Sequence, residues 1–171
     1  MSSTVLCTEL AHSYDLVCSE INYQDQSKSA CRIHHLFGNG GLACLDLGCG
    51  TGPHIDHFVQ KGYRVTGLDL NQAILDQAAL RCPQGEFSLQ DMSKFRLDSH
   101  FDLITCFLYS LHYCYPYEKF ENGLSHTFAA LNPGGFFVLT ASTINAVRPT
   151  VHSTMAHCLI FNLAGCMPVR G

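Results

Sequence analysis

The sequence predicts a single α/β domain with a mostly parallel, doubly wound sheet. From Gly41 onward, short apolar runs alternate with amphipathic stretches, a pattern typical of repeated strand-helix-strand units. The run over 42–47 is apolar except for Asp46, as expected of a strand that is buried on both faces. The 171 residues, of which 47% are hydrophobic, suffice for one domain with one core.

The first elements follow from periodicity and from the residues that stop each element. A helix is expected over 25–37, because apolar residues recur on one face and a glycine-rich stretch follows. Its core-facing residues are expected to be Ala30, Ile33, Leu36 and Phe37. After the strand at 42–47, a helix is expected over 53–61. It begins with Pro53, whose missing N–H costs nothing in a first turn.

Four further strands and two helices complete the predicted sheet. The strands are expected at 64–69, 87–89, 101–107 and 136–140. Between the first two lies a helix over 71–81, for which Asn71 is the expected N-cap. The other helix has an apolar stripe at spacings of three and four, formed by Tyr117, Phe120, Leu124 and Phe128. We expect it to end before Asn132-Pro133-Gly134-Gly135, which would lead into the last strand as a turn.

The chain divides into three expected segments. Residues 1–40 form an N-terminal cap segment and helix, residues 41–140 the sheet with its ligand site, and residues 141–171 a short atypical tail without Asp or Glu. No antiparallel hairpin is evident in the tail. Residues 157–163 can form one strand but lack a second partner, so the strand at 136–140 is expected to expose an edge. Such an edge allows two copies to pair as a homodimer.

Composition narrows the class of function. The net charge of −4 gives no broad attraction for nucleic acid. The ten cysteines are scattered without a Cys-x-x-Cys pair, so we expect reduced thiols and no metal site. Residues 149–169 carry no formal charge, but their polar side chains and two prolines argue against a membrane span. No secretion signal opens the chain. We therefore expect a cytoplasmic protein that acts on a small molecule.

A glycine turn follows the first predicted strand. Gly48-Cys49-Gly50-Thr51-Gly52 lies between a buried strand and a helix, where doubly wound sheets bind nucleotide-like ligands. Glycines allow the backbone to turn tightly and to approach a ligand closely, because they carry no Cβ. A purely structural tight turn is the alternative interpretation of this pattern.

The turn fits S-adenosylmethionine better than a dinucleotide. A dinucleotide fingerprint requires its last glycine where this chain has Pro53. Asp46, two residues before the turn, would repel a pyrophosphate but attracts an ammonium group. S-adenosylmethionine carries an α-ammonium and a sulfonium and no phosphate. A carboxylate that only satisfies the loop is the alternative for Asp46.

Two more carboxylates follow the next strands. Asp69 ends the strand at 64–69, where its two oxygens can accept hydrogen bonds from a ribose diol. Asp91 can accept from the adenine amino group, and the backbone N–H of Met92 can donate to the adenine ring. The alternatives are a helix cap for Asp69 and a turn-forming role for Asp91.

These motifs together resemble the ordered motif set of class I S-adenosylmethionine-dependent methyltransferases, which have a Rossmann-like fold. The resemblance rests on Leu45 to Gly52, Gly67-Leu68-Asp69-Leu70, Gln90-Asp91-Met92, Phe101-Asp102-Leu103-Ile104 and Leu131 to Gly135. Tyr14-Asp15-Leu16, Tyr23 and the stretch over 92–97 are similar to small-molecule N-methyltransferases, a group that includes amino-sugar N,N-dimethyltransferases.

The resemblance implies roles for further residues. Tyr14 would close over the methyl donor near its sulfonium, Tyr23 would lie near the methionine moiety, and Phe107 would line the donor pocket through its backbone. Donor-binding residues implied by the motifs as a whole are Tyr14, Tyr23, Asp46, Gly48, Cys49, Gly50, Asp69, Leu70, Asp91, Met92 and Phe107. Tyr14 would also align the reaction, and His112, shortly after the strand at 101–107, is the best placed general base.

The predicted function is methyl transfer from S-adenosylmethionine to a small nucleophile, most plausibly an amine. A tyrosine or histidine that only packs is the alternative for Tyr14, Tyr23 and His112. Because the tail is short, a donor-binding protein with little or no transferase activity is a second interpretation. A third interpretation is an RNA acceptor, which the negative net charge disfavours. A fourth is a dinucleotide-dependent oxidoreductase, which Asp46 and the spacing of the glycines disfavour.

Overall fold

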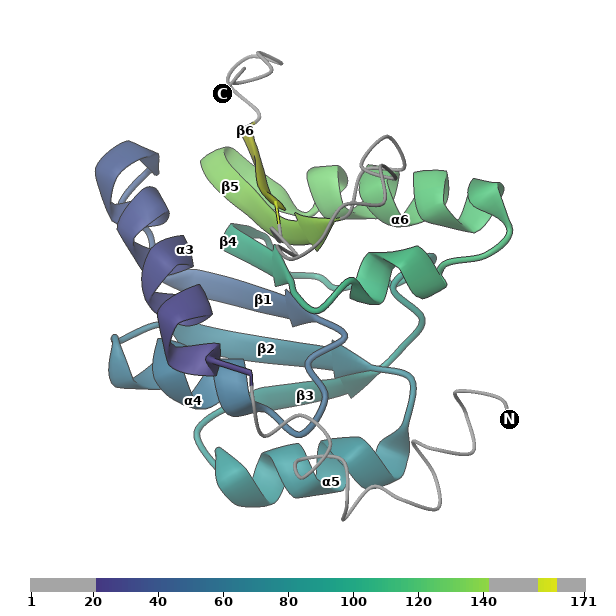
Figure 1. The fold of residues 1–171 in the computed structure, drawn as a ribbon, viewed down its shortest axis with the longest axis horizontal. Coiled ribbons are helices and arrows are strands. Elements are labelled where there is room, and N and C mark those ends of the chain that lie inside the picture. Colours follow the sequence, from purple (N-terminus) through teal and green to yellow (C-terminus); the bar gives the residue numbers. More distant parts are fainter. Residues whose placement is uncertain (1–20, 142–156, 163–171) are drawn as a thin grey trace, which may run out of the picture.

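The computed structural model describes residues 21–141 and 157–162, which form one six-stranded sheet flanked by helices (Figure 1). The strands are β1 (Ala43–Leu47), β2 (Arg64–Asp69), β3 (Glu86–Leu89), β4 (Phe101–Cys106), β5 (Leu131–Ala141) and β6 (His157–Asn162). The helices are α3 (Tyr23–Phe37), α4 (Pro53–Gln60), α5 (Gln72–Arg81) and α6 (Tyr117–Ala129), with a short 3₁₀ helix, η1 (Ser110–Tyr113). Among the described helices, none is long and apolar enough to span a membrane.

The strand order is β3-β2-β1-β4-β5-β6, in which β1 to β5 run parallel. The chain leaves β1 towards β2 on one side and later returns to β4 on the other side, so the order reverses at β1. Ligands of doubly wound sheets bind outside the carboxyl ends of the strands at such a reversal. The predicted fold class is confirmed, and it places the candidate site at the ends of β1, β2 and β4.

Two apolar layers hold the sheet between its helices. One joins the sheet to α3, α4 and α5 through residues such as Ala30, Phe58 and Leu75. The other packs Leu111 of η1 and the partly buried Phe120 of α6 against the opposite face. Strands buried on both faces carry continuous apolar runs, and all six residues of β4 are buried.

Several expected boundaries and contacts differ in the structure. Helix α3 begins two residues earlier than predicted, at Tyr23, because the Asn22 side chain accepts from the backbone N–H of Asp25. The prediction that Leu36 and Phe37 face the core is wrong, since they are 58% and 68% exposed. They occupy the last turn of α3, and α3 instead buries Ser27, Ala30 and His34. The middle of α3 therefore packs against the sheet, whereas its last turn extends beyond the sheet.

The helix α6 keeps most of its predicted apolar stripe. Phe120, Leu124 and Phe128 pack against the core, but Tyr117 is 66% exposed. Tyr117 is the first residue of α6, where the helix has not yet reached the sheet. Asn71 caps α5 as predicted, since its side chain accepts from the backbone N–H groups of Ala73 and Ile74.

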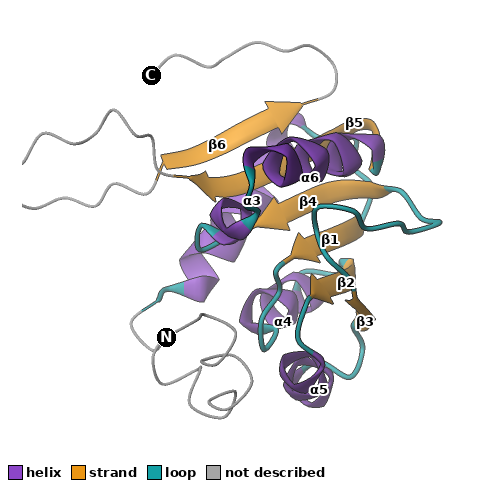
Figure 2. Ribbon diagram, turned by 90° about the vertical axis from the view of Figure 1, so that its right-hand side faces the viewer, coloured by secondary structure: helices purple, strands orange, loops and turns teal. Residues whose placement is uncertain are grey.

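Strand β5 is longer than predicted and is covered. It begins at Leu131, so 132–135 belongs to the strand and not to a turn, because Leu131 pairs with Phe101 before the register shifts. The predicted strand at 157–163 forms as β6 and pairs antiparallel with β5 over 136–141 (Figure 2). The expectation that the edge of β5 is uncovered is therefore wrong. Among the described strands, the outer edges of β3 and β6 are the ones left for pairing between two copies.

Asp102 ties together the amino-terminal ends of three strands. Its Oδ2 accepts from the backbone N–H of Ala43, and its Oδ1 accepts from the side-chain amides of Asn39 and Asn132, at 2.8 to 2.9 Å. Burial alone would raise the pKa of this carboxyl, but the three hydrogen bonds and the nearby His34 leave it below its ordinary value. The ionised form is thus the one that the fold stabilises.

Replacing Asp102 with alanine is expected to lower the free energy of unfolding by about 2–4 kcal/mol, because three donors lose a charged acceptor. Urea unfolding at pH 7 measures this loss, and Asp98→Ala, at an exposed aspartate, is the matched control. Because the folded pKa is depressed, the contribution is present above the unfolded pKa and is lost as the pH falls through the folded value. Equal stability of the two variants would contradict the assignment.

Candidate functional site

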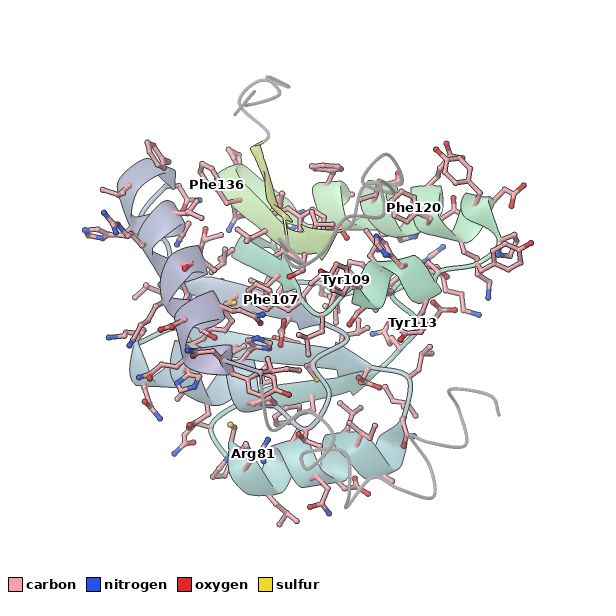
Figure 3. The ribbon with its side chains drawn as sticks, in the orientation of Figure 1. Arg81, Phe107, Tyr109, Tyr113, Phe120 and Phe136 are labelled. Carbon is pink, nitrogen blue, oxygen red and sulfur yellow. The ribbon has the colours of Figure 1, made fainter. Side chains whose placement is uncertain are left out.

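A pocket opens at the carboxyl ends of β1 and β4, beside the glycine turn. It is lined by Tyr23, Asp46, Gly48, Cys49, Gly50, Pro53, His54, Phe107, Leu108 and Ser110. These residues come from α3, β1, the turn, α4 and the segment after β4, so segments far apart in sequence meet there (Figure 3). Six of them are among the predicted donor-binding residues, which are Tyr23, Asp46, Gly48, Cys49, Gly50 and Phe107.

The glycine turn has the geometry that its sequence predicts. Gly48, Gly50 and Gly52 have φ of 70°, 57° and 80°, values that other residues rarely adopt. A Cβ on Gly48 would also lie 2.9 Å from Cβ of Ser110 and 3.1 Å from Cε of Met92. The turn is fixed to the neighbouring strand, because the N–H groups of Gly48 and Cys49 donate to the carbonyl of Leu68.

Replacing Gly48 with alanine is expected to destabilise the fold by about 2–4 kcal/mol, which combines the left-handed backbone with the contacts of the added Cβ. Gly62→Ala is the matched control, since Gly62 has φ of 88° but nothing within 4 Å of an added Cβ. We expect this control to lose only about 1–2 kcal/mol. Thermal and urea unfolding of both variants check the difference. Equal losses would show that the space around Gly48 is not limiting.

Asp46 is a buried carboxylate with an unused oxygen. Its side chain is 1% exposed, and its Oδ1 accepts from the hydroxyl of Thr105 at 2.7 Å. Its Oδ2 is buried and has no hydrogen-bond partner among the described residues. Burial raises the pKa of Asp46 to about 7; the Thr105 hydrogen bond opposes this rise, and the charge of Asp69 adds to it. A hydrogen-bond acceptor that lines a pocket and has no protein partner is suited to a ligand with a cationic group or a hydrogen-bond donor.

Asp69 holds the glycine turn from the end of β2. Its Oδ2 accepts from the N–H of Gly50 and its Oδ1 from the N–H of Asn71, both at 3.1 Å. Burial raises the pKa of Asp69, and hydrogen bonds from these backbone N–H groups counteract part of the rise. Each carboxylate oxygen has two lone pairs, so both oxygens can accept a further hydrogen bond. Capping and ligand binding are therefore compatible roles for this residue.

A second hollow lies beside the first, at the ends of β2 and β3. It is lined by Leu70, Leu89, Gln90, Asp91 and Lys94. Asp91 turns the chain there, because its Oδ1 accepts from the backbone N–H and hydroxyl of Ser93. Burial would raise the pKa of Asp91, but these hydrogen bonds and two nearby lysines hold it below its ordinary value. The exposed Leu70 offers an apolar surface at the same edge.

The segment after β4 forms the other wall of the pocket. Phe107 is 5% exposed and contributes its ring as well as its backbone, since the ring stacks on His54. Leu108 and Tyr109 have φ of 53° and 60°, a strained conformation for residues with large side chains. The hydroxyl of Ser110 donates to the carbonyl of Phe107 at 2.8 Å and closes this turn. Strained turns of this kind are often found at functional sites.

Among the predicted site residues that the structure describes, Asp69, Met92 and His112 line neither hollow. Tyr14 lies outside the described residues. His112 is exposed on η1, with its ring 5.7 Å from that of Tyr109, and it is not among the lining residues. Met92 is 9% exposed and lies under the turn, with its Cε close to Gly48. The roles of Tyr14 and His112 stay predictions.

Sequence reasoning missed Pro53, Leu108 and Ser110, which line the pocket, and three further residues that shape the site. His54 lines the pocket, Thr105 supports Asp46, and Arg81 at the end of α5 donates to the carbonyl and hydroxyl of Thr51 in the turn (Figure 3). Arg81 and Thr105 lie 30 and 59 residues from their partners, so no local pattern marks them. His54 directly follows the glycine turn and Pro53, and this position was a signal that could have been used.

The fold and the site define a Rossmann-like α/β protein with a pocket for a nucleotide-like ligand at the reversal of strand order. The chain belongs to the methyltransferase domain family, whose model matches residues 44–135, more than half of the sequence. The match begins in β1 and ends in β5, so it covers the strands that carry the site.

Curated relatives are similar over the same region. A dTDP-4-amino-2,3,4,6-tetradeoxy-D-glucose N,N-dimethyltransferase from Saccharopolyspora spinosa is 32% identical over 95 residues, which are 56% of this chain and 38% of that protein. A putative methyltransferase from a Geobacillus species is 30% identical over 133 residues, 75% of this chain and 54% of that protein. The chain thus spans about half or less of the length of these relatives.

Solved structures agree with this assignment. The crystal structure of DesVI from Streptomyces venezuelae has a TM-score of 0.71 and 27% identity, and covers 77% of this chain and 57% of its own. The structure of CalS10 with S-adenosylmethionine, described as an amino pentose methyltransferase from Micromonospora echinaspora, has a TM-score of 0.68 and 29% identity. That match covers 73% of this chain and 53% of CalS10.

Proposed function

We propose that the protein is an S-adenosylmethionine-dependent methyltransferase that acts on the amine of a small molecule, such as an amino sugar. The observation that carries the proposal is Asp46, a buried carboxylate with one oxygen unused, at the wall of the pocket beside the glycine turn. The family and the amino-sugar N,N-dimethyltransferases among its relatives support the same reaction.

The residues present fit this methyl donor. The unused oxygen of Asp46 matches an α-ammonium group, and Gly48 and Gly50 line the pocket, where glycines let a ligand approach the backbone closely. Asp69 would hold the ribose hydroxyls, and Asp91 with Met92 and the apolar Leu70 would hold the adenine. Among the described residues, no lysine or arginine lines the main pocket, so no cationic side chain there would offset the repulsion between Asp46 and a pyrophosphate.

When bound, S-adenosylmethionine supplies a methyl group that is already activated by its sulfonium, so the protein mainly has to bind, align and exclude water. Asp46 would hold the donor at its amino-acid end, and Asp69 would hold it at the ribose. Phe107, Leu108 and His54 line the pocket with largely apolar surface that keeps water out. The acceptor amine has to lose its proton, and His112 is the proposed recipient.

Binding and transfer are tested separately. Isothermal titration calorimetry with S-adenosylhomocysteine, the demethylated product, and with NAD is expected to show binding of the first compound alone. Methyl transfer to dTDP-linked amino sugars and to bulk RNA then tests the acceptor, with transfer expected only to the amino sugars. Binding of NAD, or transfer to RNA alone, would overturn the proposal.

A donor-binding protein without transfer is the second candidate function. It is favoured by the position of His112, the proposed base, which is exposed and does not line the pocket among the described residues. Binding of S-adenosylhomocysteine without transfer to any amine in this assay would support it. For either function we propose a cytoplasmic location, in keeping with the six free cysteines among the described residues.

A further inference from the structure

His54 is a buried histidine at the meeting point of three segments of the chain. It is the second residue of α4, lines the pocket and is 4% exposed. A polar ring that is buried to this extent needs partners for its nitrogen atoms. It contacts residues of α3 and of the segment after β4, two parts of the pocket wall that lie outside the glycine turn.

The first contact is a hydrogen bond to α3. The Nε2 atom of His54 lies 2.9 Å from Oε1 of Gln26, although the two residues are 28 positions apart. An amide oxygen only accepts hydrogen bonds, so this contact assigns the proton of the neutral imidazole to Nε2. Gln26 lies one turn after the start of α3. The contact therefore fixes the end of α3 that is closest to the pocket.

The other contacts are between rings. His54 stacks on Phe107, with ring centroids 4.3 Å apart and planes inclined by 30°. It meets Tyr23 edge-on, with centroids 4.9 Å apart and an interplanar angle of 75°. Both neighbours line the pocket themselves, and Figure 3 shows Phe107 between α3 and η1. One imidazole thus sets the relative positions of Tyr23 on α3 and Phe107 after β4.

The surroundings of His54 keep the ring neutral. Burial, together with a smaller effect of the neighbouring His57, lowers its pKa to about 3. A neutral ring suits this place, since a protonated imidazole would repel the sulfonium and ammonium groups of a donor in the same pocket. A buried neutral ring also keeps its hydrogen bond and its stacking over the whole working range of pH.

We propose that His54 is a positioning residue that couples the docking of helix α3 to the binding of the methyl donor. It acts through Gln26 and through the rings of Tyr23 and Phe107, and it does not itself take part in the transfer. The inference rests on the proposed function, because it concerns the same donor pocket. It adds His54 to the residues that support donor binding, through contacts with residues that are distant in the sequence.

A double-mutant cycle in the full chain tests this coupling. His54→Phe keeps an aromatic ring but loses the hydrogen bond, and Gln26→Leu removes its partner. Each change alone is expected to weaken binding of S-adenosylhomocysteine about three- to tenfold. The double variant is expected to bind as well as the single variant with the lower affinity, because both changes break the same contact and their effects do not add. Titration calorimetry measures the four affinities.

A conservative variant and a control separate positioning from general stability. His54→Gln can still donate through its amide to Oε1 of Gln26 but loses the ring contacts, so it is expected to bind more tightly than His54→Phe and more weakly than the original protein. His35→Phe, at an exposed position of α3, is expected to leave binding unchanged. In hydrogen exchange, S-adenosylhomocysteine is expected to protect the amides of 23–37 in the original protein and not in His54→Phe.

The outcomes distinguish this inference from the function on which it rests. If the unaltered protein binds no S-adenosylhomocysteine, the proposed function fails and the inference fails with it. If the unaltered protein binds and the His54 and Gln26 variants bind equally well, only the inference is overturned. The inference is also overturned if the losses of binding affinity add in the double variant, or if the variants lose unfolding stability but keep their affinity. In either case His54 would only pack in the core.

Discussion

Replacing Asp46 with asparagine is expected to weaken binding of S-adenosylhomocysteine by about 2–4 kcal/mol at pH 7.5, the largest effect on binding that we predict. The variant keeps the hydrogen bond from Thr105 but loses the charge that would pair with the ligand's ammonium group in a buried site. Titration calorimetry measures the affinity. Asp76→Asn, at an exposed aspartate on α5, is the matched control and is expected to bind like the original protein.

The same residue predicts how binding depends on pH. The pKa of Asp46 is about 7 without ligand, so at lower pH its carboxyl must lose a proton before it can pair with an ammonium. Affinity is therefore expected to fall below pH 7. It is also expected to fall above about pH 8, where an α-amino group loses its own proton. In Asp46→Asn the decline below pH 7 should disappear. A decline that persists in this variant would assign the titration to another group.

Folding should show the opposite dependence on pH. The folded pKa of Asp46 is raised above its unfolded value, so the folded state binds more protons between about pH 4 and pH 7. This contribution to the free energy of unfolding is present at low pH and is lost as the pH rises through 7. Urea unfolding of Asp46→Asn should lack this loss. The charge that donor binding needs is thus the charge that folding disfavours.

Replacing Asp69 with alanine is expected to weaken binding of the same ligand by about 1.5–3 kcal/mol, because two charge-assisted hydrogen bonds to the ribose would be lost. The structure adds a second cause, since Asp69 also holds the N–H groups of Gly50 and Asn71. Titration calorimetry at pH 7.5 gives the loss, and a thermal unfolding curve shows whether the variant is folded.

A second variant separates the two causes for Asp69. Asp69→Asn keeps one oxygen that can accept from Gly50 but replaces the other oxygen with a donor. It is expected to preserve the turn better than alanine and to lose most of the same affinity. Unchanged affinity in a folded Asp69→Ala protein would remove Asp69 from the binding site and leave it only as the residue that holds the N–H groups of Gly50 and Asn71.

The described part of the chain shows where sequence reasoning works. The strand at 64–69 and the cap at Asn71 agree with their predicted positions, because alternating apolar runs and capping residues act over a few neighbouring residues. Leu36 and Phe37 were placed in the core by the same periodicity and are exposed. Periodicity gives the face of a helix, but it does not say how far along the helix the neighbouring layer reaches.

The sequence by itself determined the parallel sheet and the glycine turn. It also determined the carboxylates Asp46, Asp69 and Asp91, since each lies close to the end of a predicted strand, where such sheets bind their ligands. Only the tertiary structure decided that β6 covers β5 and that His54 meets Gln26. It also gave Asp46 one used and one unused oxygen. Such contacts join residues that are far apart along the chain, so they depend on how whole layers pack and not on local pattern.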